Sequence, residues 1–242
     1  MHQGFRRIAL VVLIAAAVLD GVHAPAQDAA PGTVKGRARF EGAAPEAQVI
    51  RMAADPICVR EGKRTTSEAI MVGTDGALQN VFVYVKDGLG DRTFPAPATP
   101  VVLDQKGCRY TPHVFGVQVG QGVDVVNSDP TLHNVHAMPK VNAEFNFGQP
   151  VQGMRARRTF AKPEVMVPFR CDVHSWMSSY AGVLTHPFFA VTKADGSFEI
   201  TGLPPGTYVL EAWHERLGTK TQQVTVDEKK GATAAFSFMP RS

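Results

Sequence analysis

The sequence has few cysteines and lacks the short motifs that mark several common cofactors and catalytic sites. Three of its 242 residues are cysteine, and none lies in a C-x-x-C-H haem-attachment motif. The H-E-x-x-H motif of zinc proteases and the G-x-S-x-G motif of serine hydrolases are also absent. These absences argue against three familiar classes of protein, and we expect a protein that is not an enzyme.

Long apolar runs are also scarce, and the one that exists lies at the N-terminus. Residues 8–19 are apolar, follow Arg6 and Arg7, and are succeeded by small residues that end at Ala26. A membrane-spanning helix needs about 20 apolar residues, so this run is short for a span, and no other stretch comes close. We expect residues 1–26 to be a cleaved signal peptide and the mature protein to be periplasmic, with no membrane span. An uncleaved anchor is the alternative.

Excess charge and internal repeats are missing as well. The formal net charge is +3 at pH 7, and no basic run argues for a nucleic-acid partner. No period of 20 to 50 residues repeats. Hydrophobic residues make up 44% of the chain, and 22 glycines and 17 prolines are spread among short apolar segments. This composition indicates many turns and few helices, so we expect an all-β chain.

Alternating apolar and polar residues predict the strands. Residues 32–40 have the period of a half-buried strand, and residues 81–85, V-F-V-Y-V, are a second β-prone run that precedes an Asp-Gly turn. Valines recur at every second position on both sides of the Gly-Gln-Gly turn within residues 117–125, which predicts a hairpin. Residues 165–169 and 182–185 are apolar and lie on either side of a loop that carries unusual chemistry.

That loop reads C-D-V-H-S-W-M and holds Cys171, His174 and Met177; His133 lies 38 residues before the cysteine. A thiolate and two imidazoles in a plane, with a weak axial thioether, suit copper cycling between Cu(I) and Cu(II) far better than magnesium or calcium. Zinc remains an alternative, although a thioether is a poor zinc ligand. His136, three residues after His133, competes with it for the role of ligand.

The two other cysteines are a candidate disulfide. In an exported protein with an odd number of cysteines, two are expected to pair, which leaves Cys58 and Cys108 once Cys171 is assigned to the metal. Pairing requires close Cα atoms, which sequence spacing does not establish. The alternative places Cys108 with His113 in a second metal site.

The order of these motifs resembles the cupredoxins, the blue type 1 copper proteins. Tyr110-x-Pro112 is followed by a Val-x-x-Gly turn, then by Asn127, then by His-Asn-Val at 133–135 and finally by C-x2-H-x2-M. The short ligand loop is similar to that of the amicyanin branch of the family. The resemblance covers about residues 98–187.

The resemblance implies a Greek-key β-sandwich with one copper ion. Cys171 would be the thiolate ligand, His133 and His174 the imidazole ligands, and Met177 the axial thioether. Asn134 would hold the cysteine loop by a hydrogen bond, and His174 would lie near the surface, where an electron can enter or leave. One loop cysteine, in place of the C-x3-C pair of binuclear sites, predicts a single copper.

The loop departs from the family at the residues after the second histidine. Many members have proline there, whereas this chain has Ser175 followed by Trp176. We expect the altered turn and the indole to change partner docking and the reduction potential. Asp172, beside the cysteine, is expected to favour Cu(II). The amicyanin likeness implies a c-type cytochrome or a periplasmic dehydrogenase as the redox partner.

A second resemblance covers the tail. Residues 195–213, D-G-S-F-E-I-T-G-L-P-P-G-T-Y-V-L-E-A-W, resemble the carboxypeptidase regulatory-like family, which has a transthyretin-like sandwich. Two strands within residues 33–97 resemble the opening strands of that family. We therefore expect residues 33–97 and 188–240 to close one small β-sandwich, with the cupredoxin at 98–187 inserted between them. That family implies a scaffold or docking module without catalytic residues.

Together these patterns predict a periplasmic mononuclear type 1 copper protein that transfers single electrons between redox partners. Two alternatives stay open. One is a copper carrier, a copper storage protein or a structural subunit that retains the site. The other is a carbohydrate- or protein-binding accessory module without a redox role.

Overall fold

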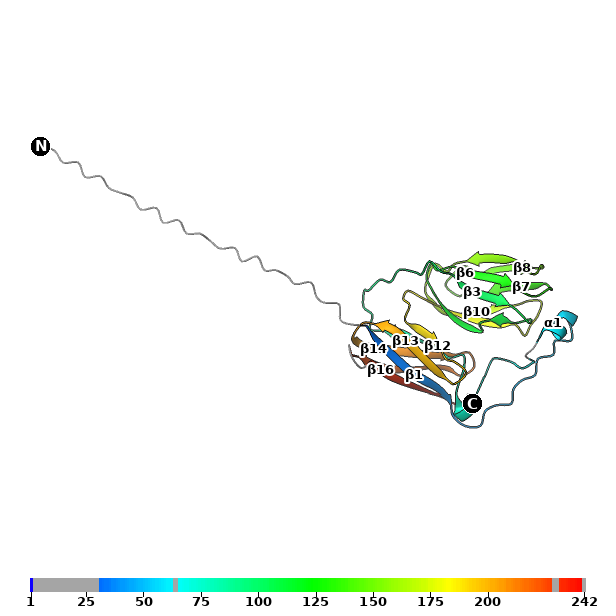
Figure 1. Ribbon diagram of the computed structural model, residues 1–242, viewed down its shortest axis with the longest axis horizontal. Coiled ribbons are helices and arrows are strands. Elements are labelled where there is room, and N and C mark those ends of the chain that lie inside the picture. Colours follow the sequence, from blue (N-terminus) through cyan, green and yellow to red (C-terminus); the bar gives the residue numbers. More distant parts are fainter. Residues whose placement is uncertain (2–30, 63–64, 228–230, 241–242) are drawn as a thin grey trace.

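In the described residues, the regular secondary structure is almost entirely β-strand, arranged as two sandwiches (Figure 1). The computed structural model describes Met1 and residues 31–62, 65–227 and 231–240. Apart from Met1, the expected signal peptide at residues 1–26 lies outside the described residues. Within the described part of the chain, no helix has the length and apolar character to cross a membrane.

The outer sandwich is built from both ends of the described chain. Its two sheets have the strand orders β13-β1-β16 and β12-β2-β14-β15. β1 pairs antiparallel with β13 and parallel with β16, and β2 lies between β12 and β14. The N-terminal segment and the tail therefore form one sandwich. Its strands are β1 (Gly32–Phe40), β2 (Phe82–Asp87), β12 (Phe189–Val191), β13 (Ser197–Leu203), β14 (Gly206–His214), β15 (Gly218–Val226) and β16 (Ala232–Phe238).

The inserted sandwich occupies the chain between β2 and β12. Its sheets have the orders β5-β11-β10-β7-β8 and β4-β3-β6-β9, and their apolar faces enclose one core. Its strands are β3 (Val101–Gln105), β4 (Tyr110–Thr111), β5 (Val114–Gln118), β6 (Val123–Asn127), β7 (His133–Ala137), β8 (Phe145–Gln149), β9 (Arg155–Arg158), β10 (Glu164–Arg170) and β11 (Ser178–Leu184).

The hairpin predicted within residues 117–125 is wrong. β5 pairs with β11, whereas β6 pairs with β3 and β9 in the opposite sheet. The chain turns at Gly120, whose φ of +81° favours glycine, and passes from one sheet to the other. Val117 and Val125 are both fully buried in the shared core. The alternation of apolar and polar residues shows which side chains face a core, but it does not show to which sheet a strand belongs. Two strands in facing sheets therefore give the same sequence pattern as a hairpin.

The two sandwiches pack closely because glycines leave room for aromatic rings. A Cβ atom on Gly116 of β5 would lie 2.1 Å from the ring of Phe189, and one on Gly182 of β11 would lie 2.3 Å from the ring of Phe82. Both rings belong to the outer sandwich, and they stack on each other with centroids 5.6 Å apart. The sheet of β2 and β12 thus rests directly on the sheet of β5 and β11.

A segment of the outer sandwich extends onto the inserted one. Between β1 and β2, residues 48–62 and 65–67 form what we call the cover segment, whose ends pair through Ile50 N–H to Thr65 O (2.6 Å). Its tip is helix α1 (Pro56–Glu61), which lies at the end of the inserted sandwich (Figure 1). Met52 and Cys58 are buried in the inserted core. A short 3-10 turn, η1 (Thr74–Gly76), follows before β2.

The close approach at Gly182 can be tested by adding one methyl group. We expect Gly182→Ala to lower the free energy of unfolding by about 1–3 kcal/mol, because the fully buried Phe82 ring cannot move aside without strain. Urea denaturation measures the change. Gly148→Ala is the control, since its Cβ would meet its nearest neighbour at an ordinary 3.7 Å. Equal stability of the two variants would contradict the packing argument.

Candidate metal centre

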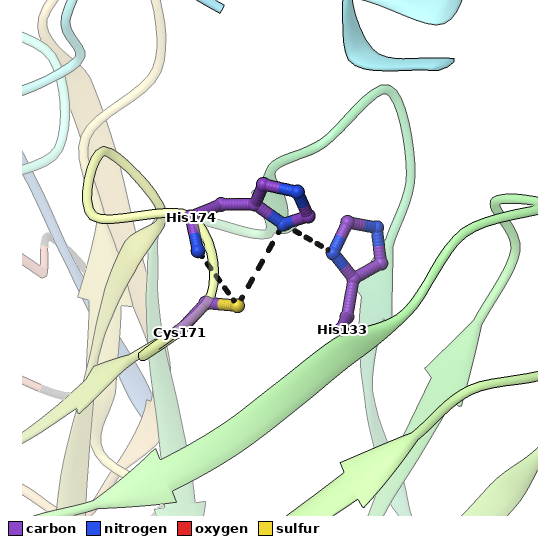
Figure 2. Close-up of side chains that lie close together, drawn as sticks. All are labelled: His133, Cys171 and His174. Carbon is purple, nitrogen blue, oxygen red and sulfur yellow. Dashed lines mark hydrogen bonds between the residues drawn. The ribbon is translucent and has the colours of Figure 1, made fainter. Parts of the chain in front are cut away.

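The three donor side chains come from two adjoining elements of one sheet. His133 is the first residue of β7, and Cys171 follows directly after β10, which pairs with β7. The loop that starts at Cys171 is closed by its own backbone: Cys171 N–H donates to Met177 O (3.2 Å), and Met177 N–H donates to His174 O (2.9 Å). Figure 2 shows the two imidazoles and the sulfur directed toward one another.

The distances between the donor atoms match those around a single ion. His133 Nδ1 lies 3.0 Å from His174 Nδ1, and His174 Nδ1 lies 3.8 Å from Cys171 Sγ (Figure 2). At tetrahedral angles, two nitrogens bound to one ion would be about 3.3 Å apart, and a nitrogen and a sulfur about 3.6 Å. Donor atoms of all three residues lie within 4.8 Å of one another, and each residue is at least 98% buried. The set fits a thiophilic metal such as copper.

Met177, the expected axial ligand, lies in the same core as Cys171 and is 1% exposed. Its backbone hydrogen bonds with Cys171 and His174 close the loop. It is thus a buried side chain in the loop that carries Cys171 and His174.

Asn134 makes the kind of contact that the resemblance implies. Its side-chain oxygen accepts a hydrogen bond from the backbone N–H of Asp172, and its own backbone N–H lies 3.5 Å from Cys171 Sγ. The backbone N–H of His174 donates to the same sulfur at 3.4 Å. β7 and the ligand loop are therefore tied together at the thiolate.

The expectation that His174 lies near the surface is wrong. His174 is 2% exposed, because the cover segment and Trp176 enclose it. Cys58 Sγ lies 3.6 Å from its Nε2 atom, and the Trp176 ring lies beside it with centroids 5.1 Å apart. The indole N–H donates to Cys108 O (3.0 Å), which fixes the ring in this position. A segment distant in sequence therefore covers this imidazole.

A disulfide fastens this cover. Cys58 and Cys108 are bonded, with Cα atoms 5.4 Å apart. This bond rules out the alternative of Cys108 with His113 in a second metal site. His113 instead faces the outer sandwich, where its Nε2 lies 2.5 Å from a carboxylate oxygen of Glu215. Cys171 remains the free cysteine.

His136, the competing ligand, points away from the centre. Its Nδ1 lies 3.1 Å from Asp172 and its Nε2 lies 2.7 Å from Glu144. An offset of three residues along a strand places two side chains on opposite faces, so His133 and His136 cannot both face the core. A hydrogen bond from Asn146 lowers the pKa of Asp172, which keeps a negative charge next to the ligand loop.

Two carboxylates that the sequence motifs did not indicate complete the surroundings of the imidazoles. Asp129 Oδ2 lies 2.9 Å from His133 Nε2, and Asp55 Oδ2 lies 3.1 Å from His174 Nε2. Thr131 also donates to Asp55, at 2.8 Å. The signals were the Asp-Pro pairs: one opens α1 as its N-cap and the other precedes His133 in the turn before β7. Neither pair indicates which histidine it meets.

Both carboxylates are stabilised in their charged form. Burial by itself raises the pKa of Asp129, but hydrogen bonds from His133 and from the backbone N–H groups of Cys108 and Gly107 outweigh it, and the pKa is lowered. Burial likewise raises the pKa of Asp55, but hydrogen bonds from Thr131, Ile57 and His174 outweigh burial, and the pKa is lowered.

The thiol of Cys171 is also prepared for metal binding. Burial raises its pKa, but hydrogen bonds with His133 and His174 and with the backbone N–H groups of Asn134 and His174 outweigh burial and lower the pKa from 9.0 to about 6. A thiolate is the form that binds metals, so near neutral pH little proton release is needed.

The tail matches a known family. Residues 183–238 match the family model of the carboxypeptidase regulatory-like domain. No curated protein is similar to the chain in sequence.

Several solved structures resemble part of the chain. A copper-containing nitrite reductase (NirK) from Thermus scotoductus SA-01 is 25% identical, with 40% of this chain and 26% of that chain covered and a TM-score of 0.31. An oxidized amicyanin mutant is 19% identical, with 48% and 93% covered and a TM-score of 0.32. A Cu(I) amicyanin mutant is 21% identical, with 42% and 97% covered and a TM-score of 0.31. The chain thus spans about a quarter of the nitrite reductase.

The fold and the family match show a chain of two β-sandwiches. In one of them, residues 183–238 match the model of the carboxypeptidase regulatory-like domain, and the other carries a thiol and two imidazoles at one end.

The lowered pKa of Cys171 predicts how the apoprotein titrates. Thiolate absorbance in the ultraviolet should appear near pH 6 rather than near 9, and Cys171→Ser should remove it. Because the folded pKa is the lower one, the thiolate stabilises the fold fully above pH 9, and this contribution is lost as the pH falls through 6. The stability difference between wild type and Cys171→Ser should follow the same curve. Titration near pH 9 would contradict the hydrogen-bond argument.

Removing the disulfide should loosen the cover. The bond links residues 50 positions apart, and we expect Cys58→Ser combined with Cys108→Ser to lower the free energy of unfolding by about 2–4 kcal/mol. Urea denaturation provides the measurement. Wild type treated with a thiol reductant is the matched comparison and should approach the double variant. An unchanged unfolding midpoint in both would show that the bond does not secure the segment.

Proposed function

We propose that the chain is an exported, mononuclear type 1 copper protein that passes single electrons between redox partners. It would act as an electron carrier and not as an enzyme. Within this proposal the copper ligands are Cys171, His133 and His174, with Met177 as the axial thioether. The partner would be a c-type cytochrome or a periplasmic dehydrogenase.

The observation that carries the proposal is the convergence of Cys171 Sγ with the two Nδ1 atoms of His133 and His174 inside a buried site. Copper bound there would supply a one-electron Cu(I)/Cu(II) couple. The side chains would hold the same geometry in both oxidation states, because one ligand lies on a strand and the others on a loop closed by backbone hydrogen bonds. Little reorganisation on electron transfer is what such a site requires.

Export to the periplasm is part of the proposal. It is supported by the sequence of residues 1–26 and by the Cys58–Cys108 disulfide, a bond that persists in oxidising compartments. The carboxypeptidase regulatory-like sandwich would act as a scaffold that supplies the cover segment.

Copper storage or delivery is the second candidate. The observation in its favour is the burial of His174, which closes the most direct path from the metal to a partner. A carrier would hold Cu(I) tightly without needing rapid electron exchange, so the colour and redox behaviour of the loaded protein separate the two functions.

Addition of Cu(II) to the purified protein should produce a strong blue absorption band, because a thiolate bound to Cu(II) absorbs visible light. The band should vanish on reduction and return on oxidation. Cys171→Ser and His133→Gln should abolish it, whereas His136→Gln, the matched control from the same strand, should retain it. Visible spectroscopy of the four proteins provides the measurement.

The other outcomes point elsewhere. A colourless protein that holds Cu(I) tightly would favour copper handling. A wild type that takes up no copper would leave the binding-module interpretation. Loss of the band in His136→Gln but not in His133→Gln would show that His136, and not His133, is the ligand.

A further inference from the structure

Each imidazole of the metal centre has a carboxylate on the side opposite the metal. His133 presents Nδ1 to the centre and Nε2 to Asp129, and His174 presents Nδ1 to the centre and Nε2 to Asp55. An ionised carboxylate only accepts hydrogen bonds, so the Nε2 atom that faces it must carry the proton. The Nδ1 atom then keeps its lone pair for the metal.

The two carboxylates are themselves held in place. Asp129 accepts from the backbone N–H groups of Gly107 (2.8 Å) and Cys108 (2.7 Å) and is 2% exposed. Asp55 accepts from Ile57 N–H (2.7 Å) as the N-cap of α1, and from the Thr131 hydroxyl (2.8 Å). Each can therefore fix the orientation of the ring that it contacts.

Their origins differ. Asp129 lies in the turn that follows β6 of the inserted sandwich, whereas Asp55 belongs to the cover segment, which comes from the outer sandwich. Asp55 is brought to His174 by the helix whose Cys58 is bonded to Cys108. The second imidazole is thus oriented by a part of the chain that lies outside the cupredoxin-like residues.

We propose that Asp55 and Asp129 are paired positioning residues for the copper site, which hold His174 and His133 with Nδ1 directed at the metal and favour Cu(II) over Cu(I). This inference rests on the proposed copper function. The thiolate and the two carboxylates together bring three negative charges to the site. These negative charges attract the double charge of Cu(II) more strongly than the single charge of Cu(I), so they stabilise the oxidised state more than the reduced state.

The test uses Asp55→Asn and Asp129→Asn in the full chain. Asparagine keeps the shape of the side chain and is a good N-cap, so α1 retains its start in the first variant. Both variants should still give the blue band. Their Cu(II) affinity should fall by about 10- to 100-fold. For each tenfold loss not shared by Cu(I), the reduction potential should rise by about 59 mV.

Asp124→Asn is the matched control. It removes the same charge from an exposed pair with Arg157 on the strands β6 and β9, and contacts neither imidazole. Its Cu(II) affinity and potential should equal those of wild type. Folded Asp55→Asn and Asp129→Asn proteins with wild-type affinity and potential would overturn the inference.

A second measurement needs neither copper nor a variant. Nitrogen NMR of the imidazoles in the wild-type apoprotein should show a proton on Nε2 of both His133 and His174, because each Nε2 faces a carboxylate. A Nε2 atom without a proton in either ring would overturn the inference even if the variants failed to fold. If wild type bound no copper but showed both Nε2 protons, the proposed function would fail while the positioning by the carboxylates stood.

Discussion

Burying a thiolate and two imidazoles at one end of a β-sandwich requires a partner for each remaining polar atom of these side chains. A buried polar group without a hydrogen bond costs about 1–3 kcal/mol, and more when it is charged. The sulfur of Cys171 therefore receives two backbone N–H groups, and the outer nitrogen of each imidazole meets a carboxylate. These partners come from β7, from the turn before it, from the cysteine loop itself and from the cover segment, so the centre is complete only where these four parts of the chain meet.

The same requirement explains why the two sandwiches are joined so firmly. The cover segment crosses to the inserted sandwich and is bonded there through Cys58. At another contact the glycines of β5 and β11 admit the aromatic rings of the outer sheet, and Glu215 meets both His113 and Tyr180. Domains joined by small polar interfaces move relative to one another. Here a covalent bond and a close-packed apolar contact oppose that motion. The orientation of Asp55 toward His174 depends on this fixed arrangement of the two sandwiches.

Much of the fold and half of the site could be predicted from the sequence. The alternation of apolar and polar residues identified the buried faces of the strands. Cys171 and His174 lie in one seven-residue loop, so their proximity does not depend on the fold of the rest of the chain. The crossing between β5 and β6 could not be predicted, because alternation is the same for a hairpin and for two strands in facing sheets. The contact of Asp55 with His174 and the burial of His174 could not be predicted either. Both depend on the position of the cover segment, whose Cys58 lies 116 residues before His174 in the sequence.

The boundary of the inserted sandwich in sequence is therefore not the boundary of the candidate metal site in space. Residues 98–187 contain all four candidate ligands, yet the wall over His174 is encoded near residue 55, ahead of the second strand of the other sandwich. The two sandwiches are consequently not interchangeable modules. An inserted sandwich transferred between proteins would arrive with its ligands but without its cover, so the insertion and the segment that covers it are constrained to change together.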